Sequence, residues 1–155
     1  MKPVDYADTQ PEFDLFEYFE GEQQAWGVFL DRFGTLRKRF KVDIVGQVND
    51  DQLKLEESFF YDDGSTQERV WLIQRLDKHN YKGTALDIAG EAKGQAFGSS
   101  LQWQYQMDLL IDGRDWRVNF NDWMFLLDKK TLVNRAEVTK FGVKVGEVIL
   151  FFKKG

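Results

Sequence analysis

The sequence predicts an all-β fold, a single antiparallel β-barrel of about eight to ten strands with a short N-terminal helical lead-in. The first observation is alternation: Phe40, Val42 and Ile44 are apolar and the residues between them are charged, which is the period of a half-buried strand. The second is a regular succession of turn-forming residues, typical of a meander of hairpins. The third is an aromatic content of 15%, because rings pack well on a pleated surface.

The N-terminal end is expected to differ from the rest of the chain. Residues 1–12 contain both prolines, Pro3 and Pro11, and little apolar pattern. We therefore expect a flexible N-terminal tail over 1–12 and a barrel domain over 13–155. Within 13–20 the apolar positions fit neither a strand nor a helix period cleanly, and we interpret this segment as a short helical turn whose rings close one end of the barrel.

From Gly21 onward, strands and turns follow one another without a long helical segment. Such a series leaves unpaired edges unless the sheet closes, which favours a barrel, whereas a two-sheet sandwich needs longer crossover loops than the chain offers. The turn residues include Asp62-Asp63-Gly64 and Asp112-Gly113, which tolerate the backbone angles of tight hairpins. The expected strands lie near 22–33, 36–47, 53–62, 67–77, 81–90, 94–110 (broken near Gly98), 114–127, 131–141 and 144–153.

Composition excludes several classes of function. A net charge of −5 argues against a general nucleic-acid binder. The basic run 37–41 places Arg37, Arg39 and Lys41 on one strand face, which we interpret as a solvated barrel exterior, with an anionic membrane surface as the alternative. No run is long enough to span a bilayer, so the chain is expected to be soluble.

No cofactor or metal is expected. The chain has no cysteine and one histidine, His79, which rules out thiol catalysis and a multi-histidine metal site. The loop at Asp62-Asp63-Gly64 is too short for a calcium cage and is expected to be a hairpin turn. The glycines at 90, 94 and 98 precede no Lys-Ser or Lys-Thr pair, so they are not a phosphate loop.

Residues 83–100 are mostly Gly, Ala, Ser or Thr. Small side chains facing a barrel interior leave volume that neighbouring side chains fill or a ligand occupies. Glycines in strands also permit the sharp bends of barrel corners, without any cavity. Both interpretations stay open.

Three acidic residues share the inward phase of apolar neighbours: Glu57, Asp87 and Asp122. A charge inside must be paired or hydrogen-bonded, or its pKa shifts until the group is neutral. Arg69, Arg75 and Arg135 are the expected partners, and structural ion pairs are favoured over catalysis. Nearby, residues 122–125 break the alternation, which suggests a β-bulge.

The order of motifs resembles an uncharacterised bacterial family, a domain of unknown function often found in predicted lipoproteins and thought to have a lipocalin-like fold. The resemblance implies that Arg135 stacks on Trp26, as a late arginine does in lipocalins. It also implies a periplasmic or membrane-anchored lipoprotein as the full-length form, with membrane contact only through a lipid anchor absent from this chain. The resemblance covers 13 to 152 and rests on Phe13-Asp14-Leu15, Tyr18-Phe19 with Gly21, Ala25-Trp26-Gly27, Arg39-Phe40 before Val42-Asp43, Tyr61-Asp62-Asp63-Gly64, Arg69-Val70-Trp71, Trp103 with Tyr105, Asp122-Trp123-Met124, Asn134-Arg135-Ala136 and Lys140-Phe141-Gly142.

These observations favour a protein that binds a small hydrophobic or amphipathic ligand, such as a lipid or fatty-acid derivative, inside the barrel. Two alternatives are an enzyme that acts on a lipid-like substrate through an interior carboxylate, and a structural or accessory lipoprotein with a solid barrel. We assign no catalytic residue, and the oligomeric state is left open. The expected ligand-binding residues are Trp103, Tyr105, Phe120, Asp122, Trp123, Asn134 and Arg135.

Overall fold

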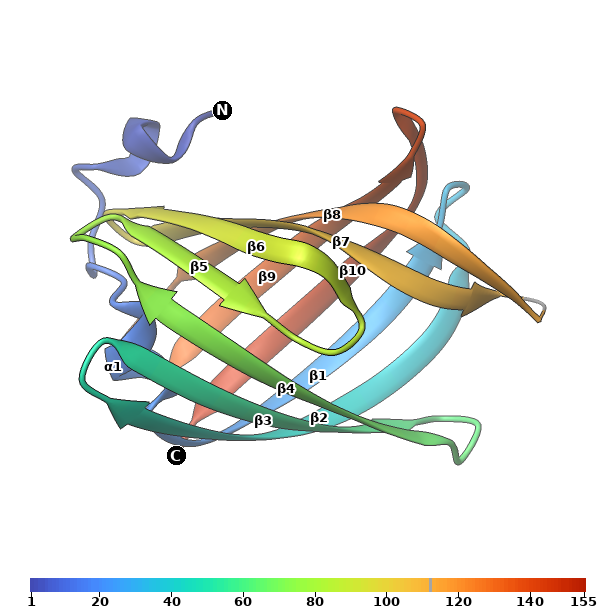
Figure 1. Cartoon of the computed structure of the whole chain (residues 1–155), viewed down its shortest axis with the longest axis horizontal. Helices are drawn as coiled ribbons and strands as arrows, with labels where there is room; N and C mark the ends of the chain where they lie inside the picture. Colours follow the sequence, from blue (N-terminus) through green and yellow to red (C-terminus); the bar gives the residue numbers. More distant parts are fainter. Residues whose placement is uncertain (112) are drawn as a thin grey trace.

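The computed structural model describes residues 1–111 and 113–155. It confirms the predicted all-β fold: in the described residues, ten strands form a closed antiparallel barrel (Figure 1). The helices are η1 (Pro3–Tyr6) and α1 (Leu15–Phe19). The strands are β1 (Gly21–Asp31), β2 (Leu36–Asn49), β3 (Gln52–Tyr61), β4 (Thr66–Arg75), β5 (Asn80–Thr84), β6 (Ile88–Phe97), β7 (Ser100–Ile111), β8 (Arg114–Leu126), β9 (Thr131–Lys140) and β10 (Val143–Lys154).

The barrel closes because the first strand pairs with the last. Each strand pairs with its neighbours in sequence, and β1 pairs with β10 from Gln23↔Lys154 to Asp31↔Gly146. Closure satisfies the backbone groups that an open edge would leave unpaired. The sandwich alternative is therefore wrong.

The interior is formed by the side chains at every second position of each strand, which point inward. On β2, Val42 and Ile44 are buried and Asp43 and Val45 are exposed, so the alternation predicted for this strand is confirmed. The basic run is on the same strand, and its Arg37 and Arg39 side chains are exposed and pair with Asp31 and Asp62. These contacts agree with a solvated exterior face.

The predicted strand boundaries are wrong in one region, between residues 81 and 97. A strand was expected over 81–90 and a new one from 94, but β5 ends at Thr84 and β6 runs through Gly90 and Gly94. The register of β6 against β7 shifts between Ala89 and Lys93, and Gly90 has a φ of 68°. Gly90 therefore lies in a bulge within β6, although in the sequence such a glycine suggests a turn between two strands.

Most of the expected turns are present where they can be compared. Asp62-Asp63-Gly64 connects β3 to β4, with a φ of 87° at Gly64. The break expected near Gly98 separates β6 from β7. The turn expected at Asp112-Gly113 includes Asp112, which lies outside the described residues.

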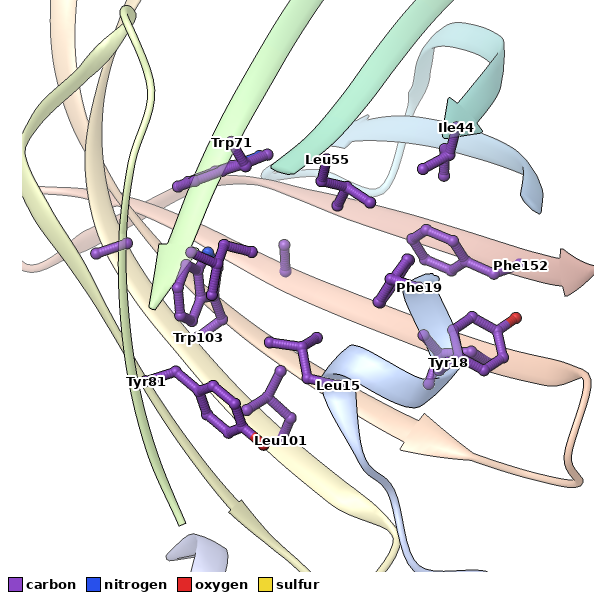
Figure 2. Close-up of a cluster of buried hydrophobic side chains, with 14 of the residues drawn as sticks. Leu15, Tyr18, Phe19, Ile44, Leu55, Trp71, Tyr81, Leu101, Trp103 and Phe152 are labelled. Atoms are coloured by element: carbon purple, nitrogen blue, oxygen red, sulfur yellow. The ribbon is translucent and has the colours of Figure 1, made fainter. Parts of the chain in front are cut away.

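The short helix α1 closes one end of the barrel. Asp14 caps it by accepting hydrogen bonds from the backbone N–H groups of Phe16 and Glu17, a standard N-cap arrangement. Arg75 of β4 donates to Asp14 at 3.0 Å and to the Tyr81 hydroxyl at 3.1 Å. The helix is thus tied to the barrel wall. Figure 2 shows Leu15 and Phe19 pointing from this helix toward the side chains of the surrounding strands.

Residues 1–12, expected as a tail, contain η1 and pack on the outside of the barrel. The Tyr6 ring meets Trp123 and Phe125 edge-on, at centroid distances of 5.7 and 5.5 Å. Thr9 Oγ1 accepts a hydrogen bond from the Ser99 backbone N–H at 2.9 Å. The N-terminal segment therefore covers part of the outer face of β8.

The prediction of a β-bulge within residues 122–125 is wrong. β8 pairs with β7 and β9 through this segment without a shift of register. The alternation is broken because Trp123 and Phe125, although they point outward, are covered by Tyr6. An apolar outer face here reflects a contact with the N-terminal segment.

Among the described residues, no helix has the length and apolar character that a bilayer crossing requires.

Candidate functional site

The barrel encloses a cavity of about 270 Å³. Leu15 and Phe19 of α1 lie at one end of it, and Lys38 and Gln67, both exposed, lie along the opposite part of the lining. The cavity therefore opens at the end of the barrel away from α1. Most of its lining is apolar, so it can accept an apolar body.

Five of the seven predicted ligand-binding residues line this cavity: Trp103, Tyr105, Phe120, Asp122 and Asn134. They come from β7, β8 and β9, and their positions follow the inward parity of those strands. The structure therefore brings this part of the predicted set together in one interior space.

The other two predicted residues, Trp123 and Arg135, point away from the cavity. Each directly follows an inward residue in its strand, so a regular ladder places it on the outer face. The Arg135 side chain is 62% exposed and donates to Glu147 at 2.6 Å. Trp26, its expected stacking partner, lies outward and is 45% exposed. No cation–π contact joins the two in the described part of the chain, so the arginine-on-tryptophan expectation is wrong.

Asp122 is a buried carboxyl group at the side of the cavity. Its Oδ2 accepts a hydrogen bond from the Tyr105 hydroxyl at 3.3 Å, and its Oδ1 is buried without a partner. Burial raises the pKa of Asp122 to about 7, although Asn134 and Tyr105 act to lower it. The pKa of Tyr105 is raised well above 10 by burial and by the charge of Asp122, so Tyr105 remains a donor.

Glu57 is the second interior acid. It stands directly across from Arg69 in the pairing of β3 with β4. Its Oε1 is buried without a hydrogen-bond partner. Burial raises the pKa of Glu57 to about 7, against the lowering effect of the Arg69 charge.

Arg69 forms its ion pair with a different carboxylate, that of Asp87. Its Nε donates to both oxygens of Asp87, at 3.2 and 3.0 Å, and its Nη2 lies 2.9 Å from Asp87 Oδ2. The guanidinium also lies 5.1 Å from the Phe59 ring centroid. The expected ion pair is thus found for Asp87, whereas Glu57 and Asp122 form none within the described residues. Arg75 and Arg135, the other expected partners, pair with Asp14 and Glu147 instead.

A cluster of rings forms the apolar wall beside these acids. Trp71 meets Trp103 at 5.6 Å and Tyr105 at 5.3 Å, both edge-on, and Tyr105 stacks on Phe120 at 5.0 Å. Trp71 was not among the predicted site residues, although its inward position on β4 indicates that it lines the cavity.

Two of the small residues of 83–100, Gly83 and Gly94, make room for Trp103. A Cβ added to Gly83 would lie 2.9 Å from the Trp103 ring, and one added to Gly94 would clash with it. The indole therefore fills the volume that these glycines leave. The interpretation in which a neighbouring side chain fills the volume therefore holds at Gly83 and Gly94.

Among the described residues, no group of three or more His, Cys, Asp or Glu side chains is arranged to hold a metal ion. His79 lies 2.8 Å from the Ala96 carbonyl through Nδ1 and stacks on Phe97, so it is engaged in the closed end of the barrel.

Two solved structures that are similar to this chain are distant from it in sequence. The S-type phycobiliprotein lyase CPES from Guillardia theta is 9% identical over 90% of both chains, with a TM-score of 0.67. A DUF3598 protein of unknown function from Nostoc punctiforme is 11% identical over 94% of this chain and 51% of its own, with a TM-score of 0.64. The likeness establishes a lipocalin-like barrel, the fold that the motifs imply.

No curated protein sequence matches this chain. A family model described as protein of unknown function (DUF3833) matches residues 1–154, nearly the full length. The chain therefore belongs to the DUF3833 family.

Proposed function

We propose that the protein binds a small hydrophobic or amphipathic molecule inside the barrel. The observation that carries this proposal is the cavity of about 270 Å³, lined mostly by apolar side chains and containing a few buried polar groups. For scale, an engineered apolar cavity of about 150 Å³ accepts benzene. The space here suits a short chain or one to two rings, and a further ring can extend through the open end of the barrel.

The composition of the lining supports a ligand with two chemically different ends. Trp71, Trp103 and Phe120 form an apolar wall, and Asp122 and Asn134 add polar atoms on one side. Ligand pockets commonly combine an apolar body with a few placed polar groups that set orientation. The similar phycobiliprotein lyase supports only the fold, because its identity to this chain is 9%.

The solid-barrel alternative has less support, since a solid barrel would leave no interior space of this size. The enzyme alternative keeps one specific observation in its favour: Glu57 and Asp122 each have a buried oxygen without a partner. A general base needs a free carboxylate within reach of its substrate. Hydrolysis of 4-nitrophenyl octanoate that disappears in both Glu57→Gln and Asp122→Asn would favour the enzyme, and wild-type protein without turnover would count against it.

Ligand binding is tested by titration with the apolar fluorophore N-phenyl-1-naphthylamine. Val148 faces the cavity, and its successor Ile149 faces outward and is 38% exposed. We expect bright, saturable fluorescence with wild-type protein, loss of binding in Val148→Trp, and unchanged binding in the matched control Ile149→Trp. A folded wild-type protein that does not bind the probe would contradict the proposal, as would equal binding by the two variants.

A further inference from the structure

The interior polar atoms that lack partners are all hydrogen-bond acceptors. In the described residues they are the oxygens Glu57 Oε1, Asp122 Oδ1, Asn134 Oδ1 and Gln23 Oε1, and the first three belong to residues that line the cavity. A buried acceptor without a donor costs about 1–3 kcal/mol. Most buried polar groups in folded proteins are paired for this reason, so three such oxygens around one space require an explanation.

Four donors deep in the cavity already act on carboxylates: Trp71 and Asn134 lower the pKa values of Glu57 and Asp122 through side-chain hydrogen bonds, and Arg69 and Tyr105 contact Asp87 and Asp122. Arg69 donates to Asp87 through Nε and lies near it through Nη2, and the Tyr105 hydroxyl donates to Asp122 Oδ2. Lys38 and Gln67 carry further donors, but both are exposed at the open end. The deep part of the cavity therefore offers acceptors to a ligand and few donors.

We infer that the ligand carries a hydrogen-bond donor at its polar end, preferentially a protonated amine, which lies against Asp122 and Asn134 while its apolar body packs on the rings of Trp71, Trp103 and Phe120. This inference rests on the proposed function. The donor would satisfy Asp122 Oδ1 and Asn134 Oδ1, the two orphaned acceptors on the neighbouring strands β8 and β9. A positive charge next to aromatic faces gains further from cation–π attraction.

The same geometry disfavours a ligand with a carboxylate head. Such a head brings two more acceptors and a negative charge to a region where Glu57 and Asp122 already act on one another electrostatically. Like charges in a poorly solvated space repel strongly. The fatty-acid class included in the sequence-based expectation is therefore the less suitable one.

In the empty protein a proton can serve the role that we assign to the ligand. The groups acting on Asp122 are Tyr105, Asn134, Glu57 and Arg69, and burial among them raises its pKa to about 7, so that a large share of the carboxyl groups is protonated at neutral pH. A protonated Asp122 can donate to one acceptor. An arriving ammonium replaces that proton with a stronger, charge-assisted bond.

The test is displacement of N-phenyl-1-naphthylamine by three ligands with the same chain: octylamine, octanol and octanoate. We expect octylamine to displace the probe at a concentration about tenfold lower than octanoate, since hydrogen bonds to charged groups are worth that much or more. In Asp122→Asn the advantage of octylamine over octanoate should disappear when both are measured against that variant's own affinity for the probe. Glu56→Gln removes the same charge from the outer face of β3 and should keep the wild-type order.

Two outcomes overturn the inference: octanoate binding as tightly as octylamine in the wild type, or an undiminished octylamine preference in Asp122→Asn. Asn134→Leu is a second variant, which removes the neighbouring acceptor and should also reduce the preference. A wild-type protein that fails to bind the probe contradicts ligand binding altogether, whereas a protein that binds the probe and prefers octanoate contradicts only the ligand class.

Discussion

Glu57→Gln gives the sharpest physical test of the interior. Glutamine keeps the length of the side chain and removes its charge. The folded-state pKa of Glu57 is raised from 4.5 to about 7 by burial. The folded protein therefore holds a proton that the unfolded chain releases, and the contribution of Glu57 to stability decreases as the pH rises from the unfolded pKa to the folded one.

The expected size follows from that shift. At 1.36 kcal/mol per pKa unit, the full change is about 3 kcal/mol, of which about 2 kcal/mol lies between about pH 5 and about pH 8. Asp122 contributes in the same direction, because its pKa is also raised to about 7. Wild-type protein should thus lose stability over this range, and Glu57→Gln should lose about 2 kcal/mol less.

The assay is urea denaturation followed by tryptophan fluorescence at the two pH values. The matched control is Glu56→Gln, because Glu56 is the adjacent residue on β3 but is exposed on the outer face. The control should follow the wild type. If Glu57→Gln and Glu56→Gln change in parallel with pH, or if the wild type becomes more stable toward alkaline pH, then Glu57 is not the costly buried acid described here.

Three further predictions concern the parts of the fold that hold the cavity in place. Gly94→Ala should lower the free energy of unfolding by about 1–3 kcal/mol through its clash with Trp103, measured by urea denaturation; an unchanged midpoint would show that the ring has room to move. Arg75→Gln should cost about 1 kcal/mol and make the α1 region more accessible to protease, because the ties to Asp14 and Tyr81 are lost; unaltered cleavage would contradict this role. Tyr6→Ala should shift tryptophan emission to longer wavelength as Trp123 loses its cover, and identical spectra would indicate that η1 does not protect that ring in solution.

The sequence predicts the barrel well wherever side-chain alternation is undisturbed. β2 and β3 were expected at 36–47 and 53–62 and are observed at Leu36–Asn49 and Gln52–Tyr61. Alternation succeeds here because each strand has one face toward the core and one toward solvent. The interpretation fails at β6, because a positive-φ glycine such as Gly90 serves equally in a turn and in a bulge, and only the pairing with β7 distinguishes them.

Only part of the candidate site could be predicted from the sequence, and the reason is related. Asp122 and Asn134 have inward parity, but Trp123 and Arg135 are their immediate neighbours, and adjacent residues of a regular strand cannot share a face. A bulge would have been needed to place both members of a pair inside, and the ladders of β8 show none there. The cause of the misleading apolar pattern, Tyr6, is more than a hundred residues away in sequence, which no local pattern can reveal.

The two interior acids bear directly on why this barrel is hollow. A barrel selected for stability alone could have apolar side chains of similar volume in place of Glu57 and Asp122. Replacing buried charged groups with well-packed apolar ones often stabilises a protein. Their buried oxygens are unpaired on the cavity side, whereas the third acid, Asp87, is fully engaged by Arg69. An acid kept only for structure would be expected to resemble Asp87. The contrast between the three carboxylates therefore favours a role for Glu57 and Asp122 toward something that enters the cavity, and it links the stability penalty at high pH to ligand selectivity. A variant such as Asp122→Asn that becomes more stable and loses the preference for an amine would show both sides of that link at once.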